Sequence, residues 1–155
     1  VHFNDVYNIA PGVKEPVGGA ARMAHVIKSM SNENPLVLFS GDAFSPSAMS
    51  TITLGAHMPP ILNTLNIKAA CLGNHDLDFG LPACQALVKQ CNFPWLASNV
   101  LEVETGKLIP GFHRTVMLEH QGVKVGVMGI IEPEWLQTLA ALDPATLVCL
   151  PFVDE

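Results

Sequence analysis

The residues best suited to chemistry follow a short apolar run at residues 69–72, which is typical of a buried parallel strand. The chain then breaks into Gly-Asn-His-Asp at 73–76, and Asp78 follows two residues later. Ligands of open α/β sheets lie outside the carboxyl ends of the strands, so an amide, an imidazole and two carboxylates there indicate metal or substrate chemistry. The open alternative is a simple turn, because Gly, Asn and Asp all favour turns for local backbone reasons.

Two further strand-like runs also end in a carboxylate. Residues 1–4 resemble the end of a strand and precede Asp5, and residues 36–39 resemble a buried strand that ends in Ser-Gly-Asp42. A glycine before the carboxylate lets the backbone turn tightly and lets an ion approach. Parallel strands place their carboxyl ends along one edge of a sheet, so we expect Asp5, Asp42 and Asn74 to line that edge.

This combination of donors suits a two-metal site. It fits Mn, Mg, Fe or Zn, and two metals about 3.5–4 Å apart can share a bridging carboxylate, clamp a phosphoryl group and generate hydroxide for in-line attack. His75 has the carboxylate of Asp78 three residues away. A histidine in that position can protonate a leaving alkoxide, while the carboxylate fixes its tautomer and raises its pKa.

The elements that must position these residues alternate between strands and helices. This β-α-β-α-α-β-α-β order predicts an α/β fold with a parallel sheet and right-handed crossovers. The second helix is predicted to begin with Ser45 as its N-cap and Pro46 at its first position. The predicted helices span residues 20–30, 48–54, 59–65 and 81–91, and the run at 94–100 predicts a fourth buried strand.

The pattern changes after residue 100. Two strand-like runs, 115–119 and 123–128, flank Gln121-Gly122 and predict an antiparallel hairpin. Residues 134–142 predict a last helix, and we expect an irregular tail from Asp143 onward.

Four histidines lie away from the motifs and are not assigned to the site. His25, on the outer side of the first predicted helix, is expected to be solvated, and His57 to lie in a loop. His113 and His120 flank the hairpin, where we expect exposed residues that limit edge pairing rather than ligands.

The composition fits a single domain with a sizeable core. The chain has 155 residues, of which 49% are hydrophobic and only 14% charged, below the roughly 25% charged of an average globular domain. The net charge of −6 argues against a general nucleic-acid binder, which usually has a basic face. No apolar run reaches about 18 residues, so we expect no transmembrane segment.

The cysteines bear on the compartment. Cys84 and Cys91 fall on the apolar face of a predicted helix, and none of the four cysteines forms a C-x-x-C pair. We interpret them as buried thiols in a reducing compartment, which favours the cytoplasm, rather than as disulfides. The sequence begins at Val1 rather than at a Met, so the lack of a leader says little and an extracytoplasmic location stays open.

The ordered motifs resemble the 5′-nucleotidase family of calcineurin-like metallophosphoesterases. The resemblance extends over nearly the whole chain, and the G-D…G-N-H-D order at this spacing is specific. The matching segments are His2-Phe3-Asn4-Asp5, Gly18-Gly19-Ala20-Ala21-Arg22, Gly41-Asp42, Gly73-Asn74-His75-Asp76, Asp78-Phe79-Gly80, Ser98-Asn99-Val100 and Glu134-Trp135-Leu136.

The resemblance implies a role for each matching residue. Asp5 would bind the first of two divalent metal ions (Mn, Zn, Mg or Fe), Asp42 would bridge both ions, and Asn74 would bind the second. His75 would be the catalytic histidine, with Asp78 as its carboxylate partner. Substrate-binding residues are not indicated.

One position departs from the family pattern. The family usually has D-x-H in its first motif, and here the third position is Tyr7. A phenol is a poorer ligand for Mn or Zn, and a phenolate favours ferric iron, so whether Tyr7 is a metal ligand stays open.

The resemblance also implies a larger fold. The family has a four-layer α/β/β/α sandwich, and residues 1–155 would be the N-terminal part of its catalytic domain, roughly the first half. The remaining metal-binding histidines and the C-terminal domain that grips the nucleoside are then expected outside this chain. His113 and His120 do not match the missing motifs.

The expected function is two-metal-dependent hydrolysis of phosphate monoesters, with a nucleotide as the favoured substrate. A phosphodiesterase or a sugar-phosphate phosphatase of the same family is an alternative, because substrate choice depends on the missing part. A non-catalytic module that holds a phosphate or a partner in an incomplete metal site is another. The isolated 155-residue fragment is expected to be inactive.

Overall fold

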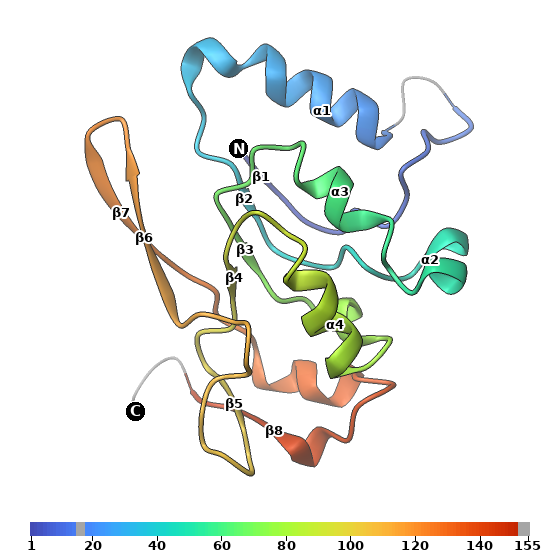
Figure 1. Ribbon diagram of the computed structural model, residues 1–155, viewed down its shortest axis with the longest axis vertical. Helices are drawn as coiled ribbons and strands as arrows, with labels where there is room; N and C mark the ends of the chain where they lie inside the picture. Colours follow the sequence, from blue (N-terminus) through green and yellow to red (C-terminus); the bar gives the residue numbers. More distant parts are fainter. Residues whose placement is uncertain (15–17, 152–155) are drawn as a thin grey trace.

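A four-stranded parallel sheet forms the centre of the protein (Figure 1). The computed structural model describes residues 1–14 and 18–151. The domain expected over residues 1–155 is therefore described except for residues 15–17 and 152–155. The strands have the same order in the sheet as in the chain, which confirms the predicted parallel arrangement. They are β1 (His2–Phe3), β2 (Leu38–Phe39), β3 (Ala69–Cys71) and β4 (Trp95–Leu96).

Helices connect the strands at the four predicted places. Figure 1 shows α1, α3 and α4 on one side of the sheet and the β6–β7 hairpin on the other. Short 3₁₀ turns follow α1 and β3, as η1 (Ser31–Glu33) and η2 (His75–Leu77). The α-helices are α1 (Ala20–Ser29), α2 (Ala48–Thr53), α3 (Met58–Leu62) and α4 (Leu81–Val88).

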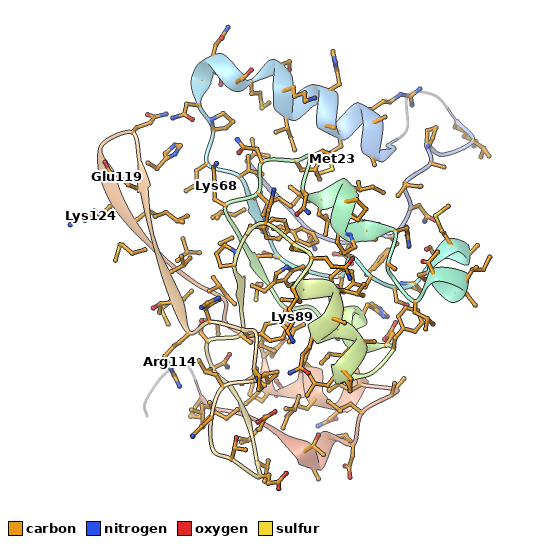
Figure 2. The ribbon with its side chains drawn as sticks, in the orientation of Figure 1. Met23, Lys68, Lys89, Arg114, Glu119 and Lys124 are labelled. Carbon is orange, nitrogen blue, oxygen red and sulfur yellow. The ribbon has the colours of Figure 1, made fainter. Side chains whose placement is uncertain are left out.

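The core packs between the sheet and these helices. Trp95 of β4 is fully buried, and its ring lies 5.9 Å from the ring of Phe39 and 5.3 Å from that of Phe44, measured between centroids. Met23 points from α1 toward the body of the protein, where it packs against the core (Figure 2). Close packing of this kind holds the strands, and with them the loops at their carboxyl ends, in fixed positions.

The start of α2 differs from the prediction. Ser47, not Ser45, is the N-cap: its Oγ accepts the Ser50 N–H at 3.0 Å, and the Ser50 Oγ accepts the Ser47 N–H at 2.8 Å. This reciprocal pair satisfies two N–H groups that the helix leaves free, so it outweighs the signal of a proline at the first position. Pro46 lies outside the helix and follows a cis peptide bond.

The last third of the chain contains three corrections. The predicted fourth strand at 94–100 divides into β4 and a separate β5 (Val100–Glu102). The predicted last helix is a 3₁₀ segment, η3 (Pro133–Thr138). The tail is not irregular, because η4 (Pro144–Thr146) leads into β8 (Leu147–Cys149), which pairs antiparallel with β5.

Asn99 explains this arrangement. Its side-chain amide donates to the carbonyls of Ile131 (2.7 Å) and Leu150 (2.9 Å), and its Oδ1 accepts the Ile131 N–H at 2.9 Å. The buried side chain thus ties β5 to two segments that follow much later in the chain. Tertiary contacts of this kind override weak local preferences.

The predicted antiparallel hairpin is confirmed as β6 (Thr115–His120) and β7 (Val123–Met128). Both central residues of its turn have positive φ, 50° at Gln121 and 79° at Gly122, as two-residue hairpin turns require. Figure 2 shows Glu119 and Lys124 near the turn, with Lys124 pointing away from the body of the protein. The Gln121 side chain donates to the carbonyls of Glu33 (3.1 Å) and Asn34 (3.3 Å), which joins the hairpin tip to the turn after α1.

All four cysteines are free thiols; Cys84 is buried and the other three are half-buried. Cys91 follows α4 rather than lying on it, because the helix ends at Val88. None of the helices in the described ranges has the length and apolar character needed to cross a lipid bilayer.

Candidate functional site

The loops after β1 and β2 run side by side beyond the sheet. The Asp5 N–H donates to the Gly41 carbonyl at 3.1 Å, and the Val6 N–H donates to the Asp42 carbonyl at 3.0 Å. Asp5 (φ 59°) and Asp42 (φ 63°) both adopt the left-handed conformation, which aspartate tolerates better than most side chains. The two carboxylates therefore leave neighbouring strands at the same edge, as predicted.

The loops after β2 and β3 also touch, and glycine makes this possible. A Cβ atom added to Gly41 would overlap the backbone of Gly73, and one added to Gly73 would overlap the Asp42 carboxylate. Only residues without a side chain allow this close approach. The sequence motifs G-D and G-N-H-D are thus in direct contact.

Tyr7 lies across the two carboxylates. Its hydroxyl donates to Asp5 Oδ1 and lies 3.2 Å from Asp42 Oδ2, while the Asn4 side-chain amide donates to the other Asp5 oxygen. Burial, followed by the hydrogen bond to Asp5, raises the pKa of Tyr7 well above its usual value. Tyr7 is therefore a protonated phenol here and acts as a hydrogen-bond donor toward the carboxylates.

Both carboxylate oxygens of Asp42 have hydrogen-bond partners. Its Oδ1 accepts the His75 N–H at 2.9 Å, and its Oδ2 faces Tyr7. Burial raises the pKa of Asp42, and the His75 N–H, the charge of His75 and the Tyr7 hydroxyl oppose this shift only in part. Asp42 and Asn74 line the same open hollow of about 450 Å³, which also borders Glu132, Glu134 and Trp135.

His75 and Asp78 form a pair at this edge. The His75 Nδ1 and Asp78 Oδ2 atoms are 2.9 Å apart, and the side chains are 37% and 22% exposed. Burial lowers the pKa of His75, but the hydrogen bond and the charge of Asp78, together with Asp42 and Asp76, outweigh it, and the net pKa is raised. The pairing at Nδ1 leaves Nε2 as the ring nitrogen that a substrate can reach.

Asp76 has a role that sequence reasoning missed. Its side chain is only 1% exposed, and its two oxygens accept four backbone N–H groups, those of Asp42, Ala43, Phe44 and Gly73. Burial raises the pKa of Asp76 to about 6, and the N–H groups of Ala43, Gly73 and Asp42 oppose the shift. The only signal in the sequence is a second carboxylate inside the polar cluster, and it does not indicate that the side chain turns inward.

The other histidines lie outside this arrangement. His25 and His113 are exposed, and His120 is half-buried within β6. His57 lies in the turn between α2 and α3, as expected, and its Nδ1 lies 2.7 Å from the Thr53 hydroxyl. His2 pairs with the Ser40 hydroxyl at 2.7 Å.

The donor chemistry fits part of a metal centre. The oxygen donors of Asp5, Asp42 and Asn74 suit hard divalent cations. Within the part of the chain that the structure describes, no group of three or more His, Cys, Asp or Glu side chains could hold a metal ion. The described residues therefore offer oxygen donors at this edge without forming a complete group of that kind.

Comparison with known proteins identifies similar chains. No family model matches the sequence. A probable 5′-nucleotidase of Treponema pallidum is 28% identical over 120 residues, which cover 76% of this chain and 20% of that protein. The 5′-nucleotidase of Rattus norvegicus is 30% identical over 144 residues, which cover 90% of this chain and 24% of that protein. The chain thus spans about a fifth to a quarter of the length of these relatives.

Solved structures share the fold. A 5′-nucleotidase precursor from Thermus thermophilus superposes with a TM-score of 0.80 at 24% identity, over 97% of this chain and 31% of that one. A calcineurin-like phosphoesterase from Bacillus subtilis superposes with a TM-score of 0.73 at 20% identity, over 98% of this chain and 53% of that one. The expected fold class and the resemblance are confirmed: over most of its length, this chain matches the N-terminal part of the domain of 5′-nucleotidases and calcineurin-like phosphoesterases.

Proposed function

We propose that this protein hydrolyses phosphate esters, with a nucleoside 5′-monophosphate as the favoured substrate. The observation that carries the proposal is the His75–Asp78 pair, 2.9 Å apart, beside the Asp42 carboxylate at the carboxyl edge of a parallel sheet. The similarity to 5′-nucleotidases over 76% and 90% of the chain supports the reaction class.

In this proposal Asp5, Asp42 and Asn74 are ligands of two divalent ions, with Asp42 as the bridging residue. When bound, the ions would neutralise charge on the phosphoryl group and activate a water molecule. Asp42 is suited to this position because burial raises its pKa, so a nearby cation would relieve the cost of its charge. The other ligands are proposed to lie outside this chain.

His75 is proposed as the proton donor. Asp78 holds Nδ1, so the ring is oriented with Nε2 toward the reacting group. The raised pKa keeps a proton on the imidazole closer to neutral pH, where it can be passed to the oxygen of the departing alcohol. Asp78 orients the ring and stabilises its charge without contacting the substrate.

Tyr7 leaves two possibilities for the first metal position. Either the phenol loses its proton and becomes a ligand, or it remains a hydrogen-bond donor to Asp5 and Asp42 beside the metal. The second is favoured, because burial and the neighbouring carboxylates raise the pKa of Tyr7.

Residues 1–155 are proposed as the first portion of the catalytic domain, with substrate selection by segments outside them. A phosphodiesterase or a sugar-phosphate phosphatase therefore remains as an alternative activity. The four free thiols support a reducing compartment, and the cytoplasm is the proposed location.

A second candidate is a non-catalytic module that holds a phosphate or a partner. Two observations favour it. No group of three or more His, Cys, Asp or Glu side chains among the described residues could hold a metal ion, and Tyr7 stands where the resemblance leads us to expect a histidine ligand.

The two candidates are separated by assays on the full-length protein. Metal content is measured first, and hydrolysis of AMP, a sugar phosphate and bis(p-nitrophenyl) phosphate is then compared in the wild-type and His75→Ala proteins. Turnover of AMP that depends on His75 supports the nucleotidase. Metal-free protein without turnover of any ester would support the module.

A further inference from the structure

Asp76 is the most deeply buried carboxylate at the edge of the sheet, and its hydrogen bonds all come from the backbone of the neighbouring loops. Oδ2 accepts the N–H groups of Asp42 (2.9 Å) and Gly73 (3.0 Å). Oδ1 accepts those of Ala43 (2.8 Å) and Phe44 (3.2 Å). None of these four amides belongs to a helix or a strand, so no backbone ladder holds them.

These bonds join two loops that leave different strands. Asp42, Ala43 and Phe44 follow β2, whereas Gly73 and Asp76 itself follow β3. The first loop carries Asp42 and the second carries Asn74 and His75. The His75 N–H also crosses between the loops to Asp42 Oδ1 (2.9 Å), but that carboxylate is itself a proposed metal ligand. Asp76 instead joins the backbones of the two loops, so its carboxylate fixes their spacing.

We propose that Asp76 is a positioning residue that sets the loops of Asp42, Asn74 and His75 in their working arrangement before any metal binds. The inference rests on the proposed function only in that Asp42 and Asn74 are taken as the metal ligands. Residues that orient ligands without touching the metal typically change metal affinity or activity by about 10–100-fold when they are lost.

The chemistry requires a carboxylate of this length. A side-chain amide has one acceptor oxygen, so Asp76→Asn would turn an NH₂ group toward two backbone N–H donors and lose their bonds. Buried donors left without an acceptor are costly, so the loops would move apart to reach other partners. The expected consequence is a change in the spacing of the ligands, in addition to a loss of stability.

The test compares Asp76→Asn with Asn63→Asp in the full-length protein. Asn63 also joins two segments through side-chain-to-backbone bonds, accepting the Asn92 N–H (2.8 Å) and donating to the Gln90 carbonyl (2.9 Å). It follows α3 and so lies before the start of β3, at the opposite edge of the sheet. Each substitution is nearly isosteric and disturbs side-chain-to-backbone hydrogen bonds that join two segments of the chain.

Mn²⁺ binding to each metal-free protein is measured by titration calorimetry, with the melting temperature recorded alongside. Asp76→Asn should bind Mn²⁺ about 10–100-fold more weakly than wild type. Asn63→Asp should lower the melting temperature while Mn²⁺ affinity stays at the wild-type value. Equal Mn²⁺ affinity in Asp76→Asn and wild type would overturn the proposal.

If Asp76→Asn does not fold, hydrogen exchange of the wild-type protein tests whether Asp76 orders the two loops without metal. In metal-free protein the amides of Asp42, Ala43, Phe44 and Gly73 should exchange as slowly as those of β3, because the carboxylate already holds them. Fast exchange that becomes slow only with Mn²⁺ would show that metal orders the loops, and would refute the role of Asp76. Neither readout uses substrate, so absence of phosphatase activity would contradict the proposed function alone.

Discussion

At the scale of single residues, the carboxylates of the candidate site differ in what they contact. Asp5 and Asp42 face Tyr7 at the edge of the sheet, Asp78 holds the ring of His75, and Asp76 binds only backbone. The spacing in the sequence was enough to predict the His75–Asp78 pair, because a local 3₁₀ turn brings residues three apart together. The role of Asp76 could not be predicted, since it depends on two loops approaching within the contact that Gly41 and Gly73 allow.

The proposed division between metal ligands and proton donor gives a first prediction for the full-length protein. His75→Ala should leave the metal content nearly intact and lower turnover by about 10²–10⁴-fold, the usual range for general acid-base help. Asp42→Ala should instead empty the metal site. Metal analysis and steady-state kinetics on both variants check this. If His75→Ala removes the metal, or leaves turnover unchanged, the assigned roles are wrong.

Tyr7 gives a second prediction, and its two possible roles differ in spectrum and affinity. If the phenol ligates ferric iron, the iron-loaded protein should have a visible charge-transfer band that disappears in Tyr7→Phe. If Tyr7 only donates hydrogen bonds beside the metal, Tyr7→His should raise the affinity for Mn or Zn, because imidazole suits those ions better. Unchanged spectra together with unchanged affinity would place Tyr7 outside the metal's ligands.

At the scale of elements, the parallel sheet was predictable and the later pairings were not. The strands β2 to β4 are largely buried apolar runs followed by polar residues, and this local pattern is visible in the sequence. Strand β1 is less apolar, with His2 exposed and Phe3 half-buried. The β5–β8 ladder joins Val100 to Cys149, and its partners are chosen by tertiary contacts such as those of Asn99. A short run such as Leu147–Cys149 carries no local signal strong enough to identify it as a strand.

The connection between α2 and α3 gives a prediction for pH. The His57 Nδ1 lies 2.7 Å from the Thr53 hydroxyl, while its Nε2 is buried without a hydrogen-bond partner. Burial lowers the pKa of His57 below 6.5, so the folded protein favours the neutral ring. The stability from this preference is complete above the unfolded pKa of about 6.5 and is lost as the pH falls toward the folded value.

Thermal melts between about pH 7.5 and 5 check this prediction in the wild-type and His57→Gln proteins. The wild type should lose more stability than His57→Gln over the acidic part of the range, because glutamine has no proton to gain. Parallel loss of stability in the two proteins would mean that His57 is not the group responsible.

At the scale of the whole molecule, exposed apolar residues of the β6–β7 hairpin set the expected behaviour of the chain. Met117, Val123 and Met128 of the hairpin are exposed by 59–68%, and Ile130 just beyond it is 42% exposed. Exposed apolar patches beyond a few hundred Å² are unusual for a soluble monomer. The exposure of these apolar side chains is consistent with the finding that the chain matches only part of the length of larger phosphoesterases.

The isolated 155-residue chain should therefore associate and show no phosphatase activity above background with added Mn. Its described residues offer Asp5, Asp42 and Asn74 as oxygen donors, whereas a catalytic site generally needs three or four well-placed ligands with supporting contacts. Size-exclusion chromatography, binding of a hydrophobic dye and AMP hydrolysis check the prediction. Val123→Lys in the hairpin should reduce association and serves as the matched variant. A monomeric chain that hydrolyses AMP would require the ligands to be reassigned around His2, His57, His113 or His120.

The order of strands in the central sheet has a consequence for synthesis. Each of β2, β3 and β4 pairs with the strand that precedes it in the chain. As the polypeptide leaves the ribosome at about 5–20 residues per second, every new strand meets an edge that already exists. The loops that carry Asp42 and Asn74 can therefore come together as soon as β3 and the turn after it have been translated. Strand β5, in contrast, must wait for its partner β8, which follows much later in the chain.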